Sequence, residues 1–251
     1  MTRIEQLRLE DVEASVALHL DHLRLGLFPR LGQRFMRFYH ETFIHSPHGV
    51  ALVAREGGEV IGVLFGTASN AAHYRWVVRN RSWKLGATGL AALLSRPMLA
   101  LKFMTTRGPR YARAIMRRLS PASKSRGGSG APLPVLSHVV TAPDVRQRGV
   151  GRKLVKAFAQ QVRRDGAQAA LLVTEEDGLG TPFFERIGAR LAAKRIGQDG
   201  VPVREYRLTL GDASRYENTE PDRTGRPVFG PNHARIGPPE HLSARAGHSP
   251  G

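Results

Sequence analysis

The stretch that decides the fold runs Val139-Val-Thr-Ala-Pro-Asp-Val-Arg-Gln-Arg-Gly-Val-Gly-Arg152. It begins within an apolar run over residues 135–141, which predicts a buried strand. A stripe of apolar residues at helical spacing follows it: Leu154, Val155, Phe158 and Val162. The stretch therefore leads from a strand into a helix. Its two glycines let backbone N–H groups converge at the start of that helix, which is an arrangement that binds phosphate.

Three other interpretations of this loop can be weighed. A dinucleotide-binding fingerprint requires a third glycine where Leu154 stands, and a tighter turn after the strand. A Walker loop requires Gly-Lys-Ser/Thr, which this stretch lacks. The last alternative is an ordinary glycine-containing turn without a ligand, and the loop taken alone leaves it open.

The remaining pattern predicts a mixed α/β protein. Residues 50–54 and 60–65 flank Gly57-Gly58 as a hairpin, because glycine adopts positive φ cheaply. The other expected strands cover residues 4–9, 169–174 and 203–210, and the other expected helices cover residues 11–19, 31–43 and 182–187. The expected order is β-α-α-β-β, an insert, and then β-α-β-α-β.

In this context the loop Arg146-x-x-Gly149-x-Gly151 resembles the acetyl-coenzyme A (acetyl-CoA) loop of the GNAT N-acetyltransferase superfamily. Residues 182–189, Pro-Phe-Phe-Glu-Arg-Ile-Gly-Ala, are similar to a second segment of that family, and residues 51–62 look like its second and third strands. The resemblance covers residues 1–70 and 131–210, in the family order. It implies a GNAT-type mixed central sheet flanked by helices.

The resemblance also implies where acetyl-CoA, the co-substrate, would bind. The fourth and fifth strands of the family splay apart, so backbone groups of Val139 and Thr141 would bond the pantetheine, and an N–H near Val139 or Val140 would stabilise the oxyanion. Asp177 stands where the family often has an asparagine that contacts the cofactor through water. The pyrophosphate would be held by the amides of the loop: Arg146, Gln147, Arg148, Gly149, Val150, Gly151 and Arg152.

The acceptor would attack the thioester directly, and the proton-transfer groups are harder to assign. His138 is the candidate general base, because histidine titrates near neutrality; the alternative is a histidine packed on the other face of the sheet. Glu175 and Glu176 are alternative bases. The family commonly has tyrosine where this chain has Phe184, so the acid is absent, is replaced by water, or is another residue such as Tyr206.

The composition limits the compartment and the partners that can be expected for this protein. The 251 residues carry 38 Lys and Arg against 21 Asp and Glu, a formal charge of +17, which is typical of proteins with an acidic partner. There is no cysteine, so a disulfide framework, a thiolate zinc site and a cysteine nucleophile are excluded. The scattered histidines predict no metal site. The N-terminus lacks the apolar core of a signal peptide, so we expect a cytoplasmic protein, with peripheral attachment to a membrane as an alternative.

The charge is unevenly distributed along the chain. No acidic residue lies between Glu59 and Asp144, whereas residues 71–130 hold thirteen Lys and Arg together with both tryptophans. Four segments result: an N-terminal part of the GNAT domain (1–70), a basic insert expected to be helical (71–130), a C-terminal part with the acetyl-CoA loop (131–210), and a tail (211–251) whose composition predicts disorder.

The insert has three interpretations. Its helices could cover the acceptor side and pack on the core, lie on an anionic membrane, or contact nucleic acid or an acidic protein. Its long apolar run weighs against nucleic acid. The sequence thus predicts an acyl-CoA-dependent N-acyltransferase acting on an unidentified small-molecule or peptide amine. The alternative is a catalytically degenerate GNAT-fold module that binds an anionic membrane, nucleic acid or an acidic partner.

Overall fold

The computed structural model describes residues 1–23, 26–106, 133–176, 178, 180–197 and 201–211, all within a first compact unit, Met1–Glu217. The second unit, Asn218–Gly251, and almost all of the predicted tail lie outside the described residues. The strands are β1 (Arg3–Gln6), β2 (Gly49–Glu56), β3 (Glu59–Thr67), β4 (Val135–Thr141), β5 (Ala169–Glu175), β6 (Arg190–Ile196) and β7 (Pro202–Thr209). The α-helices are α1 (Val12–His22), α2 (Gln33–His45), α3 (Asn70–Asn80), α4 (Ser82–Leu94), α5 (Pro97–Thr106), α7 (Val150–Arg164) and α8 (Gly180–Arg186); short 3₁₀ turns are η1 (Leu9–Asp11), η2 (Pro29–Leu31) and η3 (Pro143–Val145).

The strands form one seven-stranded sheet in the order β1-β2-β3-β4-β5-β7-β6. All neighbours pair antiparallel except β4 and β5, which are parallel. The predicted mixed sheet flanked by helices is therefore confirmed. The prediction missed one strand, β6, between α8 and β7. Its side chains are almost all exposed at the sheet edge, so its sequence shows no apolar alternation.

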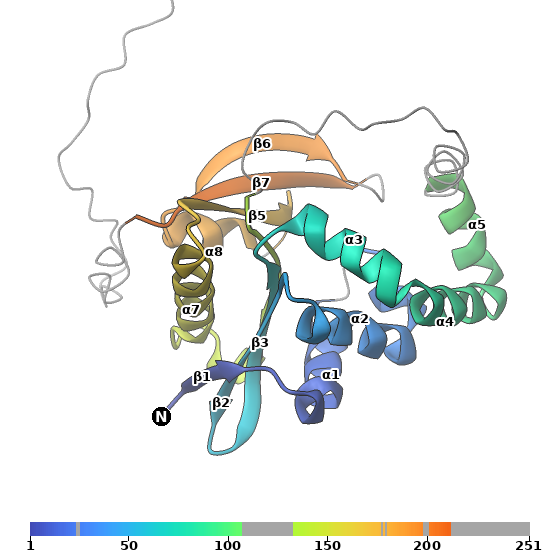
Figure 1. Cartoon of the computed structure of the whole chain (residues 1–251), viewed down its shortest axis with the longest axis horizontal. Coiled ribbons are helices and arrows are strands. Elements are labelled where there is room, and N and C mark those ends of the chain that lie inside the picture. The colour runs from blue at the N-terminus through green and yellow to red at the C-terminus, as the bar shows by residue number, and fades with distance from the viewer. Residues whose placement is uncertain (24–25, 107–132, 177, 179, 198–200, 212–251) are drawn as a thin grey trace, which may run out of the picture. The chain divides into compact units, whose positions relative to one another are not determined.

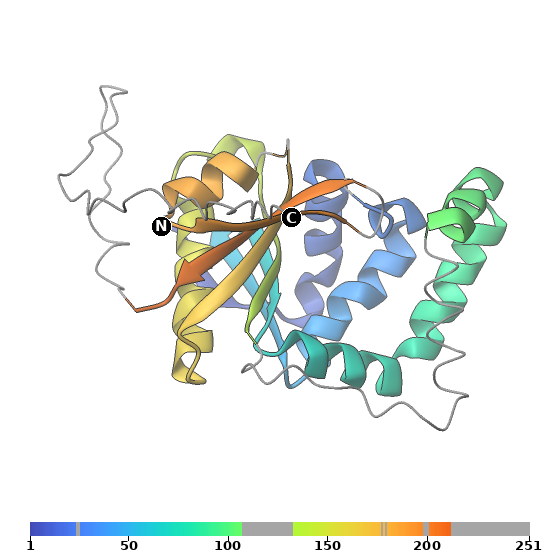
Figure 2. The same ribbon diagram turned by 90° about the horizontal axis from the view of Figure 1, so that it is seen from above.

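Each face of the sheet has its own hydrophobic core. On one face, α7 buries its stripe, including Leu154 and Phe158, against β2, β3 and β4. On the other face, α1 and α2 pack Val16, Met36 and Phe43 against β2 and β3. Figures 1 and 2 show α7 on one side of the sheet and α1 to α5 on the other. The strand β4 thus lies between two packed layers, with a different set of side chains on each face.

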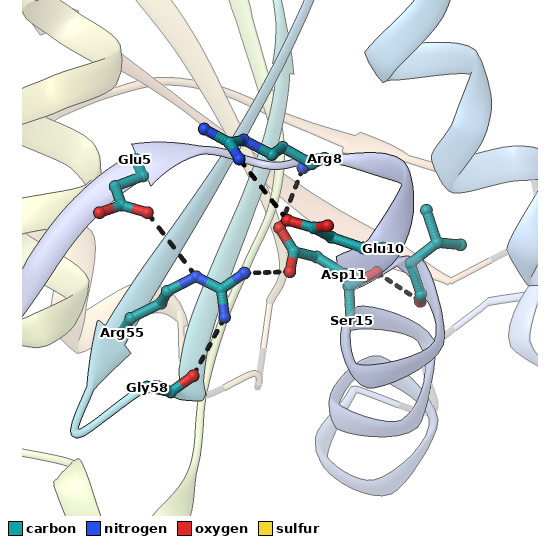
Figure 3. A network of polar contacts seen from close by, with 8 residues as sticks. Glu5, Arg8, Glu10, Asp11, Ser15, Arg55 and Gly58 are labelled. Atoms are coloured by element: carbon teal, nitrogen blue, oxygen red, sulfur yellow. Dashed lines mark hydrogen bonds and ion pairs between the residues drawn. The ribbon is translucent and has the colours of Figure 1, made fainter.

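A polar network anchors α1 to the hairpin of β2 and β3 (Figure 3). Asp11, which is buried, accepts a hydrogen bond from the backbone N–H of Arg8 (3.0 Å) and pairs with the guanidinium of Arg55. Arg55 also donates to the carbonyl of Gly58 (3.1 Å) and lies 3.7 Å from a carboxylate oxygen of Glu5. These contacts fix the start of α1, which carries two of the site residues described below.

Candidate functional site

The strands β4 and β5 separate soon after they start. Their only paired residues are Val135 with Leu171 and Leu136 with Leu172. On its other edge β4 stays paired with β3 as far as Thr141, opposite Gly62. The second half of β4 therefore has a neighbour on one side only. A sheet edge of this kind offers unpaired backbone donors and acceptors to an extended ligand.

A β-bulge marks the point where the two strands diverge. His138 faces Phe65 on β3, and the next pair is Leu136 with Gly66, so Ser137 is an extra residue on β4. A bulge bends its strand and increases the local twist, which turns the remainder of β4 away from β5. Because the bulge also changes the alternation, Leu136 packs in the α7 core whereas Val140 packs in the α1–α2 core.

Beyond the bulge, the backbone N–H and C=O groups of successive β4 residues point alternately to β3 and to the gap. The N–H of Ala142 donates to the carbonyl of Ile61 on β3 (2.9 Å). Antiparallel pairs alternate, so Val140 also bonds to β3, through Val63, while Val139 and Thr141 direct their N–H and C=O groups toward the gap. The sequence placed Val139, Val140 and Thr141 together at the cofactor. In the structure the backbone of Val140 is engaged by β3, and only Val139 and Thr141 face the gap.

The glycine-containing loop lies directly after β4. The backbone adopts positive φ at Gln147 (64°) and at Gly149 (81°), which is the N-cap of α7. Gln147 is the only described residue other than glycine with positive φ, so the loop holds a strained conformation. The first-turn N–H groups of α7, at Val150 and Gly151, point out of the helix without intrahelical acceptors, at the positive end of the helix dipole. The geometry suits an anion.

The side chains around the loop differ in their exposure and in the residues that they contact. Arg146 and Gln147 are exposed and Arg152 is half-buried. The guanidinium of Arg148 pairs with Glu56 at the end of β2 (2.7 Å), so its charge is engaged on the hairpin side of the loop. A Cβ on Gly151 would lie 3.4 Å from the ring of Phe183, which is an ordinary van der Waals contact, so the position can carry a side chain. Asp177 lies outside the described residues.

His138 projects from β4 to the face covered by α1 and α2. Its Nε2 shares a hydrogen bond with the hydroxyl of Tyr39 on α2 (2.9 Å), and its ring centroid lies 4.9 Å from that of His19 on α1. His138 is half-buried, whereas His19 is almost fully buried. The candidate base is thus part of a polar cluster between the sheet and the helices α1 and α2. It lies on β4, the strand that has one edge at the gap.

The rest of the cluster has a fixed hydrogen-bond polarity. The hydroxyl of Ser15 donates to the carbonyl of Val12 (2.8 Å), so it accepts from Nδ1–H of His40 (2.9 Å). Nε2 of His40 then lacks a proton and accepts from Nδ1–H of His19 (3.1 Å). This leaves Nε2 of His19 as an acceptor. The hydrogen bonds of these buried side chains therefore all run in one direction: His19 donates to His40, His40 donates to Ser15, and Ser15 donates to the carbonyl of Val12.

Burial keeps the histidines neutral. Loss of hydration lowers the pKa of His138 to about 4. Burial, and then the charges of His138 and His40, lower the pKa of His19 to about 2. Burial followed by the charge of His138 lowers the pKa of His40 to about 3. At pH 7 the cluster is therefore uncharged, and His138 carries a lone pair that can receive a proton.

Two other proton-transfer candidates, Glu176 and Tyr206, form hydrogen bonds with other side chains. Glu176 lies 2.8 Å from Nζ of Lys194 and 3.1 Å from Nη2 of Arg204, and the hydrogen bonds from these two residues lower the pKa of Glu176. A carboxylate held in this way is a weak base. Phe184 is buried in the α7 core, and the fully buried Tyr206 donates its hydroxyl to Glu185 (3.0 Å).

Sequence reasoning missed Tyr39, His19, His40 and Ser15. Tyr39 lies within the helix predicted over residues 31–43, and only its hydroxyl, which needs a partner when buried, distinguishes it from the phenylalanines around it. The two histidines lie on different helices, so no spacing connects them.

Among the described residues, no group of three or more His, Asp or Glu could hold a metal ion. A cavity of about 410 Å³ lies away from β4, between the start of α2 and α4, with Arg34 and Arg96 in its lining.

A mixed sheet with a bulged, splayed strand pair and a glycine-containing helix start defines the GNAT class of fold. The family model described as FR47-like protein matches residues 131–196, which include β4, the loop, α7, β5 and α8. A comparison with curated protein sequences finds no match.

Two solved structures share this architecture. The ribosomal-protein-S18-alanine N-acetyltransferase from Escherichia coli is 11% identical, with a TM-score of 0.50, over 88% of this chain and 99% of that one. SsHAT is 19% identical, with a TM-score of 0.52, over 84% of this chain and 99% of that one. The chain therefore has the GNAT fold, and the FR47-like family model matches the part of it that carries β4, the loop and α7.

Proposed function

We propose that this protein is an N-acyltransferase that transfers the acetyl (acyl) group of acetyl-CoA to the amine of an acceptor. The observation that carries the proposal is the gap between β4 and β5, which opens beside a helix start built to receive an anion. An extended chain that ends in a pyrophosphate fits both parts at once. Neither part alone would distinguish acetyl-CoA from an ordinary phosphate ligand.

The described residues would divide the work between the two ends of the cofactor. Val139 and Thr141 would pair with the pantetheine amides along the free edge of β4, and the amides of Val150 and Gly151 would hold the pyrophosphate. When bound, acetyl-CoA supplies a thioester whose carbonyl an amine can attack. The N–H of Val139, directed into the gap, would stabilise the negative charge that develops on that oxygen.

Proton transfer would be carried out by residues on the face of β4 that α1 and α2 cover. His138 is neutral at pH 7, so it is free to take the proton that the acceptor nitrogen must lose. Tyr39, bonded to Nε2 of His138, would set the orientation of the ring and is a positioning residue. His138 therefore stays our candidate for the catalytic base because of its position on β4. Its lowered pKa makes it a weak base at pH 7, as is Glu176.

Calorimetric titration with acetyl-CoA tests the cofactor site through Gly151→Glu. The new carboxylate would stand against the pyrophosphate, and repulsion at close range should lower the affinity at least about a hundredfold. An acidic residue in the first turn of a helix does not harm the helix, so the fold should survive.

Gly86→Glu is the matched control for this titration. Gly86 lies on the exposed side of α4, where an added Cβ meets nothing within 4 Å, so this variant should bind like the wild type. No binding of acetyl-CoA by a folded wild-type chain would refute the proposal, and normal binding by Gly151→Glu would refute the assignment of the loop.

The second candidate is a GNAT-fold binding module without turnover. Phe184 favours it, because a buried phenylalanine cannot protonate a departing thiolate, and Tyr206 is already engaged with Glu185. Release of free coenzyme A, measured with a thiol reagent over a panel of amines, separates the two candidates. Turnover with any amine supports the transferase, and tight acetyl-CoA binding without release across the panel supports the module.

A further inference from the structure

Helix α4 is apolar around its whole circumference. Its thirteen residues, Ser-Trp-Lys-Leu-Gly-Ala-Thr-Gly-Leu-Ala-Ala-Leu-Leu, include one charge, Lys84. The inner side packs on the α1–α2 core through Leu85, Ala92 and Leu93. A helix on the surface of a soluble domain normally turns a polar face outward. The outer side of α4 must therefore be explained by something other than this core.

That outer side exposes large apolar side chains in one line. Trp83, Leu90 and Leu94 are seven and four residues apart, which places them on one helical face, and they are 70%, 58% and 77% exposed. Helix α5 repeats the arrangement, because Leu99 and Phe103 pack inward whereas Met98, Leu101 and Met104 are exposed. We call these six exposed side chains of α4 and α5 the apolar face. Figures 1 and 2 show these two helices on the far side of α2 from the sheet.

Concentration on one surface distinguishes the apolar face from scattered exposed residues. Of the twelve large apolar side chains that are exposed in the described chain, eight lie on α3, α4 and α5. Such a concentration of exposed apolar side chains on three consecutive helices indicates an interaction site. The other four are Met1, Leu9, Leu191 and Ile196.

The charge around the apolar face has one sign. No Asp or Glu occurs between Glu59 and Asp144, so the three helices carry basic residues only. On α3, Arg75 and Arg79 are exposed beside Tyr74 and Val78. On α4, Nζ of Lys84 lies 5.5 Å from the ring centroid of Trp83, close to the apolar face itself. The partner must therefore accept Leu, Met and Trp side chains and also carry negative charge.

We propose that the apolar face, flanked by the basic residues of α3, docks on the surface of an anionic lipid bilayer. Such a surface combines acyl chains with phosphate and carboxylate headgroups, which complement the apolar face and the arginines respectively. A second copy of this chain would bring the same positive charge and repel. A nucleic acid would neutralise the arginines and leave Leu94 and Met98 in water.

The lengths of α4 and α5 suit helices that lie in the plane of the membrane–water interface. No helix in the described ranges is long and apolar enough to cross a bilayer. Apolar helices of about 10–14 residues are either core helices or interfacial segments, and α4 and α5, which pack one side on the core and expose apolar side chains on the other, suit an interfacial position. Aromatic and basic side chains, here Trp83, Tyr74 and Lys84, are the groups that settle at headgroup depth.

Co-sedimentation of the full chain with vesicles tests the proposal. Vesicles of phosphatidylcholine with about 30% phosphatidylserine should bind at least about tenfold more tightly than phosphatidylcholine alone, and raising the salt from about 0.1 to about 0.5 M should weaken the binding. The variant Leu90→Glu with Leu94→Glu puts two carboxylates on the apolar face. It should lower the vesicle affinity at least about a hundredfold.

The matched control makes the same change elsewhere. Leu191 and Ile196 on β6 are 48% and 66% exposed, so Leu191→Glu with Ile196→Glu adds the same charge at two other exposed apolar positions. This control should keep vesicle binding, and both double variants should keep the circular-dichroism spectrum and the thermal midpoint of the wild type. Vesicle affinity that falls equally in both would show a general charge effect and overturn the proposal.

Two further outcomes would also overturn it. A dimer of the wild type in light scattering that becomes a monomer with Leu90→Glu and Leu94→Glu, without vesicle binding by either, would assign the face to a second copy. Tighter binding to a short DNA duplex than to phosphatidylserine vesicles at about 0.15 M salt, unchanged by the Leu90 and Leu94 substitutions, would assign the charge to nucleic acid. None of these measurements depends on acetyl-CoA or on acyl transfer.

Discussion

Replacing His73 with phenylalanine should make the protein more resistant to acid. His73 begins the insert on α3, is 4% exposed, and stacks on Phe43 of α2 with ring centroids 4.7 Å apart. Its Nδ1 is buried and has no hydrogen-bond partner in the described part of the chain. Burial, and secondarily the charge of His48, lower the pKa of His73 to about 4.

The sign of the effect follows from this lowered pKa. In the unfolded chain a histidine titrates near pH 6.5, so as the pH falls the unfolded state takes up the proton first. The folded state then loses stability between about pH 6.5 and about pH 4. From pH 7 to pH 5 one such histidine costs about 2 kcal/mol. Burial also lowers the pKa values of His19, His40 and His138, so these histidines add to the loss of stability in the same direction.

Urea unfolding at pH 7, 6 and 5, followed by tryptophan fluorescence, measures the change. In His73→Phe the loss of unfolding free energy between pH 7 and pH 5 should be about 2 kcal/mol smaller than in the wild type. At pH 7 the variant should be at least as stable, because a buried polar atom without a partner is removed and the stacking on Phe43 is kept.

His45 provides the matched control, because it is exposed at the end of α2. The substitution His45→Phe should leave the loss between pH 7 and pH 5 as it is in the wild type. If His73→Phe and His45→Phe show the same pH dependence as the wild type, His73 does not stay neutral in the folded state and the reasoning fails.

Two further predictions concern the sheet and the site. In Gly66→Ala, the new Cβ would lie 2.6 Å from the ring of Phe158, so we expect a loss of about 1–3 kcal/mol and a thermal midpoint lowered by about 2–4 °C per kcal/mol; a midpoint equal to that of the wild type would contradict this close approach. In Tyr39→Phe, the hydrogen bond to His138 is lost while the cofactor site is untouched, so kcat should fall about tenfold with the KM for acetyl-CoA unchanged. An unchanged kcat would remove Tyr39 from the positioning role.

Local patterns made much of the fold predictable. The strand, glycine loop and amphipathic helix over residues 135–164 depend on neighbours in sequence, and the structure has each of them where the pattern placed it. The same holds for the hairpin at Gly57-Gly58, whose φ angles of 60° and 92° require glycine-like freedom. The edge strand β6 escaped prediction because Arg190–Ile196 is held by pairing with β7 rather than by a buried face.

The sequence by itself thus determined most of the helices and strands and the position of the loop, because these follow from the period of apolar residues and from the backbone freedom of glycine. Tertiary structure alone decided which backbone groups of β4 are free, since a bulge at Ser137 sets the alternation beyond it. It also brought Tyr39, His19 and His40 to His138 from two helices. The same holds for the insert: its sequence shows apolar and basic residues, but only packing on α2 divides them into a buried side and an exposed one.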